Sequence, residues 1–149
     1  MSAPRLAVRA VLVHESRLLL VNAYPDGRSD LWCAPGGGVE AGESLSANLV
    51  REVHEETGLT IVPGALCHIS EFHNPDTGFH QVELFFRATL SAGALSETWR
   101  DPTGIVTDRR FFTARNLSGL RFKPDILPAL AFGDPPTLNA GALERMAPP

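Results

Sequence analysis

The sequence is poor in cysteine, has no long apolar run and shows no excess of positive charge. Cys33 and Cys67 are too few to staple a small secreted scaffold, so a reduced, cytoplasmic protein is expected. Arg9, His14 and Arg17 interrupt the most apolar stretch, which falls short of the roughly 18–20 residues that span a bilayer. The formal net charge of −4 argues against a broad basic surface. We therefore expect neither a membrane nor a nucleic acid as a partner.

The length and the composition are those of one ordinary globular domain, with 149 residues, 44% hydrophobic and 20% charged. The negative charge is concentrated between Gly37 and Leu59, where there are five acids and one base, while the rest of the chain is balanced. We expect a folded domain over residues 1–132. The Pro-rich segment 133–149 has little apolar surface to bury, so it is expected to be a loosely ordered tail.

Apolar segments bounded by turn residues predict strands over Leu6–Val13, Arg17–Val21, Leu59–Val62, Ala65–Phe72, Phe79–Leu90 and Arg109–Thr113. The clearest helix is expected over Glu43–Thr57, with Ser44 as its N-cap and Gly58 as a left-handed terminus. Shorter helices are expected near 114–117 and 124–132. Strands on both sides of one strong helix predict an α/β fold, in which helices cover the faces of a mixed sheet.

Three glutamates, Glu52, Glu55 and Glu56, form a stripe on the predicted helix next to its apolar face. Glu56 falls between Leu45 and Leu49, where an unpaired carboxylate would cost several kcal/mol. A nearby cation would offset this cost, and Mg²⁺ or Mn²⁺ is the natural candidate because hard divalent ions prefer oxygen ligands. The alternative is an ordinary solvated face of a helix.

A glycine-rich segment, Pro35–Gly38, precedes this helix. Without side-chain bulk, its backbone groups can approach a phosphate or a metal ion directly. The alternative is a plain flexible turn.

Residues 37–59 match a known motif at each of its defined positions. Gly37, five residues, Glu43, seven residues and then REVHEETGL (51–59) resemble the complete signature of the Nudix hydrolases, GX₅EX₇REUXEEXGU. Nine specified positions at fixed spacing make this motif specific. A looser resemblance, in the strand-rich N-terminal part and the Phe111-Phe112 strand, extends over about Arg5 to Phe132.

The resemblance implies an α/β/α sandwich with a mixed central sheet, and hydrolysis of the pyrophosphate bond in a nucleoside diphosphate linked to a further group X. Carried over by position, Glu52, Glu55 and Glu56 would be the metal carboxylates, with the Gly36 carbonyl as a further ligand. Glu56 would also serve as a base for water. Arg51 completes the catalytic set by orienting a glutamate from the adjacent turn, and the cofactor would be Mg²⁺ or Mn²⁺.

The sequence leaves the substrate and one further acid open. Trp32, Phe79 and His80 are candidates for stacking on a base, with packing as the alternative role of each. The best candidate for an additional catalytic acid is Asp108, and Glu71 and Glu83 are others; the alternative role of each is that of an ordinary surface or strand-end acid. Pro75, sixteen residues after Leu59, resembles a marker of the ADP-ribose-hydrolysing subgroup.

Two functions remain after the sequence analysis. The first is a hydrolase of nucleoside triphosphates, oxidised nucleotides or ADP-ribose-like nucleotide sugars. The second is a catalytically silent module of the same fold that binds or senses a nucleotide. Because a module without catalysis would be expected to lack a glutamate of the signature, the complete set favours the enzyme. Both a monomer and a homodimer are compatible with the sequence.

Overall fold

The computed structural model describes residues 3–24, 28–134, 138 and 140–149. Its strands are β1 (Arg5–His14), β2 (Arg17–Asn22), β3 (Trp32–Cys33), β4 (Gly36–Gly38), β5 (Thr60–Asn74), β6 (Phe79–Ala92), β7 (Asp108–Thr113), β8 (Phe122–Lys123) and β9 (Ala140–Arg145). Its helices are α1 (Leu45–Thr57), α2 (Ala114–Leu117) and α3 (Leu127–Phe132). Each predicted strand and helix has a counterpart, so the local patterns in the sequence identify most of the elements.

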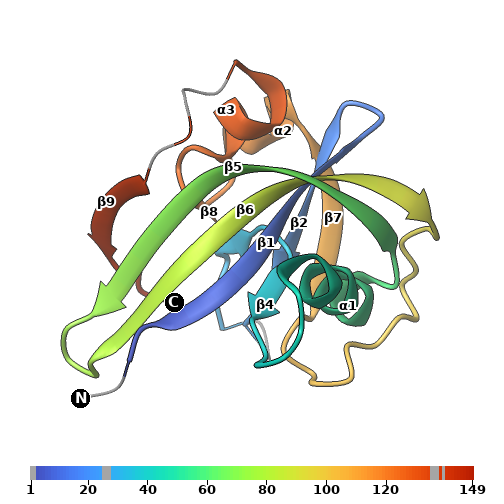
Figure 1. The fold of residues 1–149 in the computed structure, drawn as a ribbon. Helices are drawn as coiled ribbons and strands as arrows, with labels where there is room; N and C mark the ends of the chain where they lie inside the picture. Colours follow the sequence, from blue (N-terminus) through green and yellow to red (C-terminus); the bar gives the residue numbers. More distant parts are fainter. Residues whose placement is uncertain (1–2, 25–27, 135–137, 139) are drawn as a thin grey trace.

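The long strand β1 connects the two halves of the sheet. Within the described residues, the strand order is β8-β3-β2-β1-β6-β5-β9, with β4 paired to β1 and β7 paired to β2. β1 is parallel to β6 and antiparallel to β2 and β4. Figure 1 shows β1, β6 and β5 running side by side as long strands. The sheet is therefore mixed, as expected.

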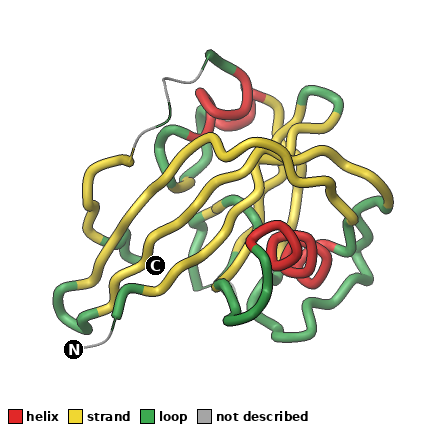
Figure 2. Tube along the Cα trace, viewed as in Figure 1, coloured by secondary structure: helices red, strands yellow, loops and turns green. Residues whose placement is uncertain are grey.

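Helices cover both faces of this sheet (Figure 2). Because side chains alternate across a strand, Val8, Ala10 and Leu12 of β1 point to one face and pack with the apolar residues of α1. Val11 points to the other face and packs with apolar residues of α2 and α3. The predicted α/β/α sandwich is confirmed.

The strand predicted to break near residue 63 continues through that point. β5 runs from Thr60 to Asn74 and pairs antiparallel with β6, with register shifts between Pro63 and Leu66 and between Leu66 and His68. Such bulges let a strand accommodate a proline and a glycine, which would otherwise interrupt its ladder. The two predicted segments are therefore one bent strand.

The glycine-rich segment is a strand rather than a flexible turn or loop. Gly36–Gly38 forms β4, which pairs antiparallel with β1. Gly36 has a φ of 151°, and a Cβ at this position would overlap the carbonyl oxygen of Val8. Glycine is therefore required by the close approach of two backbones, and β4 is held firmly beside α1.

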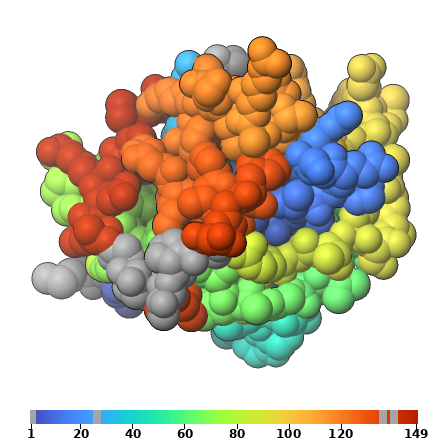
Figure 3. All heavy atoms as spheres, turned by 90° about the horizontal axis from the view of Figure 1, so that it is seen from above, coloured from blue at the N-terminus to red at the C-terminus, as the bar shows by residue number. Residues whose placement is uncertain are grey.

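The structure also differs from the expectation of a loosely ordered tail. Residues 140–145 form β9, which pairs in parallel with β5 and extends the edge of the sheet. An unpaired sheet edge offers a row of backbone groups, so a segment with little apolar surface can still dock through hydrogen bonds. Figure 3 shows the C-terminal residues, in dark red, on the surface beside the light-green β5. Residues 135–137 and 139 of the expected tail lie outside the described residues.

The described residues contain no helix with the length and apolarity needed to cross a membrane.

Candidate active site

Sequence-local interactions determine where α1 begins and ends. The Ser44 hydroxyl accepts a hydrogen bond from the Ala47 N–H at 3.1 Å. At the other end, Gly58 adopts a φ of 76° and its N–H donates to the His54 carbonyl at 2.8 Å. The predicted cap and left-handed terminus are thus confirmed. The position of each glutamate on the helix follows from these two ends.

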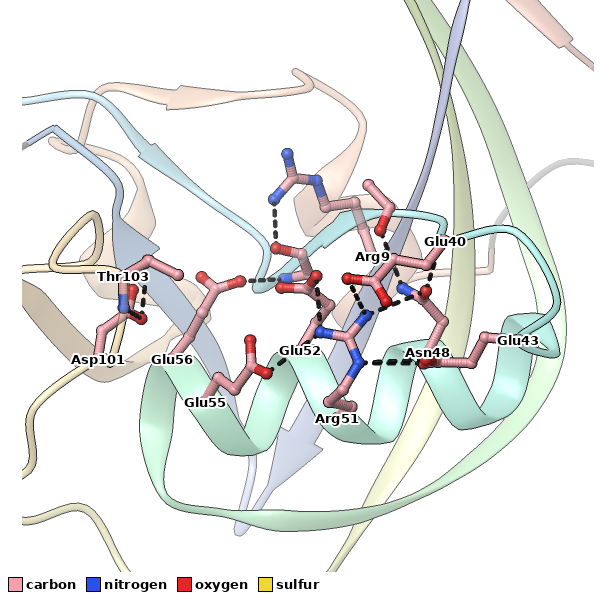
Figure 4. Close-up of polar contacts among 12 residues, drawn as sticks. Arg9, Glu40, Glu43, Asn48, Arg51, Glu52, Glu55, Glu56, Asp101 and Thr103 are labelled. Carbon is pink, nitrogen blue, oxygen red and sulfur yellow. Dashed lines mark hydrogen bonds and ion pairs between the residues drawn. The ribbon is translucent and has the colours of Figure 1, made fainter.

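Three of the four signature glutamates, Glu52, Glu55 and Glu56, project from the same side of α1 (Figure 4). Two of them lie against β4: a Cβ at Gly37 would collide with the Glu52 carboxylate, and the Gly36 N–H donates to Glu56. Replacing Gly37 by any larger residue would therefore displace an acidic side chain. The glycines and the glutamates form one unit, in which a bare backbone lies against a row of carboxylates.

Glu56 is the most deeply buried of the three, with 6% of its surface exposed. The Gly36 N–H donates to its Oε1 at 2.9 Å. Burial raises the pKa of Glu56 to about 8, with a further increase from Glu52 and Asp101, although Arg9 and the Gly36 N–H act in the opposite direction. Without a cation in the site, Glu56 therefore retains its proton at neutral pH.

Arg51 holds the outer carboxylates in place. Its guanidinium lies 3.1 Å from Glu43, 3.3 Å from Glu52, 3.2 Å from Glu55 and 3.6 Å from Glu40. One planar guanidinium can serve several carboxylates because its five donors point in fixed directions. Burial is also the main cause that raises the pKa of Glu52, and Arg51 opposes this effect. These contacts fit the orienting role expected for Arg51.

The row of carboxylates formed by Glu52, Glu55 and Glu56, called the acidic row below, suits a divalent cation. These side chains alone do not make a complete set of metal ligands. Over the described ranges, no three His, Cys, Asp or Glu side chains converge as a complete metal site. Mg²⁺ commonly uses one or two carboxylates, retains several waters and takes its other ligands from substrate phosphates. Glu56 is buried against a backbone N–H, and a cation beside it would offset its charge. The Gly36 carbonyl accepts from Arg9 at 3.3 Å and has a second lone pair for a ligand.

Two side chains from outside the signature hold the C-terminal turn of α1. Trp99 Nε1 donates to the Glu55 carbonyl at 2.9 Å, and Arg109 Nε donates to the Glu56 carbonyl at 2.7 Å. Both contacts satisfy carbonyl groups that the end of a helix leaves free. The Arg109 cation also interacts favourably with the helix dipole. The backbone that carries Glu55 and Glu56 is thus held in place by β7, which contains Arg109, and by the loop before β7, which contains Trp99.

A cavity of about 290 Å³ lies near this acidic row, although none of Glu52, Glu55 and Glu56 lines it. Arg9 connects the two, since its guanidinium pairs with Glu83 in the cavity and also donates to the Gly36 carbonyl. Gln81 continues this polar line, because it donates to Glu83 at 3.3 Å and accepts from Arg5 at 2.8 Å. The remaining walls come from six separate stretches of chain: Ala23–Tyr24, Leu31 and Cys33, Ser70–Phe72, Phe79, Lys123–Pro124 and Glu144–Ala147.

The structure separates the three aromatic candidates. Phe79 lines the cavity. Trp32 is buried in the second core, where its ring meets Phe112 edge-on at 5.1 Å, so packing is its observed role. His80 does not belong to the lining, and its Nε2 lies 2.8 Å from Glu71.

The three candidates for an additional acid also lie in different surroundings. Glu83 is buried and paired with Arg9, close to the signature glutamates. Glu71 lines the cavity and pairs with His80. Asp108 is half-exposed and pairs with Arg110 at 2.8 Å, outside the cavity lining. Of the three, Glu83 is the one linked to Glu56 through a shared arginine, Arg9.

Sequence reasoning missed Asp101, which lies beside Glu56 in Figure 4. It is buried, and its carboxylate accepts hydrogen bonds from the Thr103 N–H at 2.9 Å and the Val106 N–H at 3.0 Å. The stretch Asp101-Pro-Thr-Gly is typical of an Asx turn, and this is the signal that could have identified a structured loop. Nothing local indicates that the loop packs against α1.

The chain matches a family model described as the NUDIX domain over residues 3–130. A Bacillus subtilis protein, provisionally named an ADP-ribose pyrophosphatase, is 30% identical over 131 residues, which cover 86% of this chain and 54% of that protein. The mouse diphosphoinositol polyphosphate phosphohydrolase 3-alpha is 36% identical over 100 residues, which cover 66% of this chain and 56% of that protein. The chain thus spans about half the length of these curated relatives.

Among solved structures, the MutT NUDIX hydrolase from Burkholderia pseudomallei superimposes with a TM-score of 0.73 at 20% identity. The match covers 88% of this chain and 99% of that one, and it supports the fold. With the complete signature on α1, the glycine strand against its glutamates, and a family model that matches most of its length, this chain belongs to the Nudix family.

Proposed function

We propose that this chain is a divalent-metal-dependent pyrophosphohydrolase that cleaves the diphosphate of a nucleoside diphosphate linked to a group X. The observation that carries the proposal is the buried Glu56, which lies in the row of carboxylates on α1 and accepts a hydrogen bond from the Gly36 N–H of β4. Family membership supports the class of reaction. Bound Mg²⁺ or Mn²⁺ would neutralise the diphosphate and lower the pKa of the attacking water.

The chain's own residues divide the remaining work. Glu52, Glu55 and Glu56 would hold the metal, together with the Gly36 carbonyl. The Gly36 N–H holds one oxygen of Glu56, so the other oxygen is oriented to accept the proton of the attacking water. Arg51 keeps the outer glutamates apart from one another in fixed positions. Arg9 orients the diphosphate, and Glu83 holds the Arg9 guanidinium in place.

Among substrates, an ADP-ribose-like nucleotide sugar is the leading candidate. The ADP-ribose pyrophosphatase name belongs to the relative whose match covers the larger share of this chain. Pro75 also occupies the position that resembles a marker of that subgroup, in the turn just before the cavity residue Phe79. A ligand cavity near 300 Å³ suits one moiety of such a molecule. The free thiols of Cys33 and Cys67 fit a reducing, cytoplasmic setting.

The test is a substrate panel assayed with the full chain in Mg²⁺, in Mn²⁺ and in a chelator. The panel contains ADP-ribose, a UDP-sugar, nucleoside triphosphates, an oxidised nucleotide and a diphosphoinositol polyphosphate. We expect metal-dependent release of a nucleoside monophosphate, with ADP-ribose among the best substrates. If the chain binds nucleotides but cleaves none of them, the silent binding module replaces the hydrolase. Preferred cleavage of the diphosphoinositol compound would instead overturn the nucleotide assignment.

A further inference from the structure

The C-terminal segment 140–147 lies beyond residue 130, where the match to the family model ends, and it is docked on the sheet by its backbone. Within β9, Glu144 is paired with Phe72 and Arg145 with His73. The next residue continues the contact, since the Met146 N–H donates to the His73 carbonyl at 2.8 Å. The segment thus has a defined register along β5.

Core burial does not account for this docking. Neither hydrophobic core cluster contains a described residue beyond Phe132. The large apolar side chains of the segment remain accessible, with Leu143 49% and Met146 38% exposed. Its ion pairs are long and at the surface: Arg145 lies 3.5 Å from Asp76, and Glu144 lies 3.9 Å from Lys123. Such pairs contribute little to stability. The segment therefore has a weak structural role.

The same residues form one wall of the cavity. Glu144, Arg145, Met146 and Ala147 are four consecutive residues that all line it. The other apolar lining includes the aliphatic Leu31 and the aromatic Phe72 and Phe79, whose rings lie 6.0 Å apart at the β5–β6 hairpin. Without the segment, the cavity would be open to solvent along the edge of β5.

We infer that Glu144–Ala147 form a specificity-determining wall that holds the nucleobase of the substrate, an inference that rests on the proposed function. Aromatic rings and a thioether offer the apolar faces on which a planar base packs. The charged line of Arg9, Glu83 and Arg5 lies on the side of the diphosphate. Because the cavity has room for one moiety, the group X extends outside it. The enzyme therefore selects the nucleoside and tolerates variation in X.

The test compares Met146→Ala with Leu143→Ala in the full chain. Both variants shorten an accessible apolar side chain of the same segment, but Leu143 does not line the cavity. We expect Met146→Ala to raise KM for ADP-ribose, and the Kd for ADP measured by calorimetry in chelator, about two- to tenfold. Its kcat should be unchanged. The ratio of kcat/KM between ADP-ribose and a UDP-sugar should move toward one. Leu143→Ala should match the wild type in every measurement.

If Met146→Ala keeps the wild-type KM, Kd and selectivity while the wild type is active, the inference that Glu144–Ala147 hold the base is contradicted and the proposed function is retained. If the wild type cleaves no substrate but Met146→Ala weakens ADP binding, the proposed function is contradicted and the inference about Glu144–Ala147 is retained. A wild type that neither cleaves nor binds nucleotides overturns both.

Discussion

The two ends of the candidate site are built in different ways. At the metal end, the carboxylates, their orienting arginine and the glycines opposite them all come from residues 36–56, one continuous stretch. The cavity is assembled from stretches that begin at Arg5 and end at Ala147. Because the residues of the metal end lie close together in the sequence, the whole set can be retained in the family as one sequence motif. The cavity depends on which distant segments meet, and it is the part in which relatives with one chemistry can differ in substrate.

The largest effect is expected at the metal end, for Glu56→Gln. The change keeps the shape of the side chain and the hydrogen bond from Gly36, but it removes the carboxylate that we propose to bind metal and accept a proton. We expect kcat to fall by about 10²–10⁴-fold, as for loss of a general base, with the folded structure retained. Steady-state kinetics would measure kcat, and circular dichroism would test whether the folded structure is retained. Activity near the wild-type level would remove Glu56 from the catalytic set.

A smaller effect is expected for the pH dependence of stability in the metal-free protein. The pKa of Glu56 rises from 4.5 to about 8 on folding, mainly because of burial. Its contribution to the free energy of unfolding is therefore fully present below pH 4.5 and is lost as the pH rises through 8. We expect Tm in chelator to decrease between pH 5 and 8, by the equivalent of at most a few kcal/mol.

The control for this experiment is Glu56→Gln, which has no titrating proton and should flatten the dependence. Added Mg²⁺ should raise the Tm of the wild type more at pH 8 than at pH 6, because the ion competes with the proton for Glu56. A Tm that is independent of pH in the wild type, or a slope that is undiminished in Glu56→Gln, would contradict the buried state of this carboxyl.

The smallest effect is expected in the cavity, for Phe79→Ala. Loss of stacking on a base should raise KM about tenfold and leave kcat unchanged. The matched control is Phe86→Ala in the same strand, because Phe86 packs against the first core cluster and does not line the cavity. That variant should lower Tm without raising KM. If Phe79→Ala lowers kcat as strongly as Glu56→Gln, the two ends of the site are not separable.

Much of the metal end could be predicted from the sequence because its interactions are short-range. Ser44 and Gly58 determine the ends of α1, and helical spacing then places Glu52, Glu55 and Glu56 on one side. The resemblance to the Nudix signature assigned roles to the same residues. The contact of Arg51 with Glu55, four residues further on, also follows from neighbouring positions on a helix.

The remaining parts depended on contacts that no local pattern encodes. Asp101 resembled an ordinary turn acid, and only the packing of its loop brings it beside Glu56. From the sequence alone, Trp32 was as good a candidate for stacking on a base as Phe79. In the fold, β3 and β7 bring Trp32 against Phe112, where it is buried. Residues 140–145 carry a weak strand pattern, and they pair because the edge of β5 is available.

The sequence by itself therefore determined the chemistry that this chain can support: a helix with three carboxylates on one side, an arginine to orient them, and glycines that allow a backbone to approach. These features rest on periodicity, capping and steric exclusion, which act over a few residues. The tertiary structure alone decided the environment of that chemistry. It buried Glu56 and thereby raised its pKa, and it joined distant strands, the C-terminal one included, into a cavity, because burial and enclosure are properties of the whole fold.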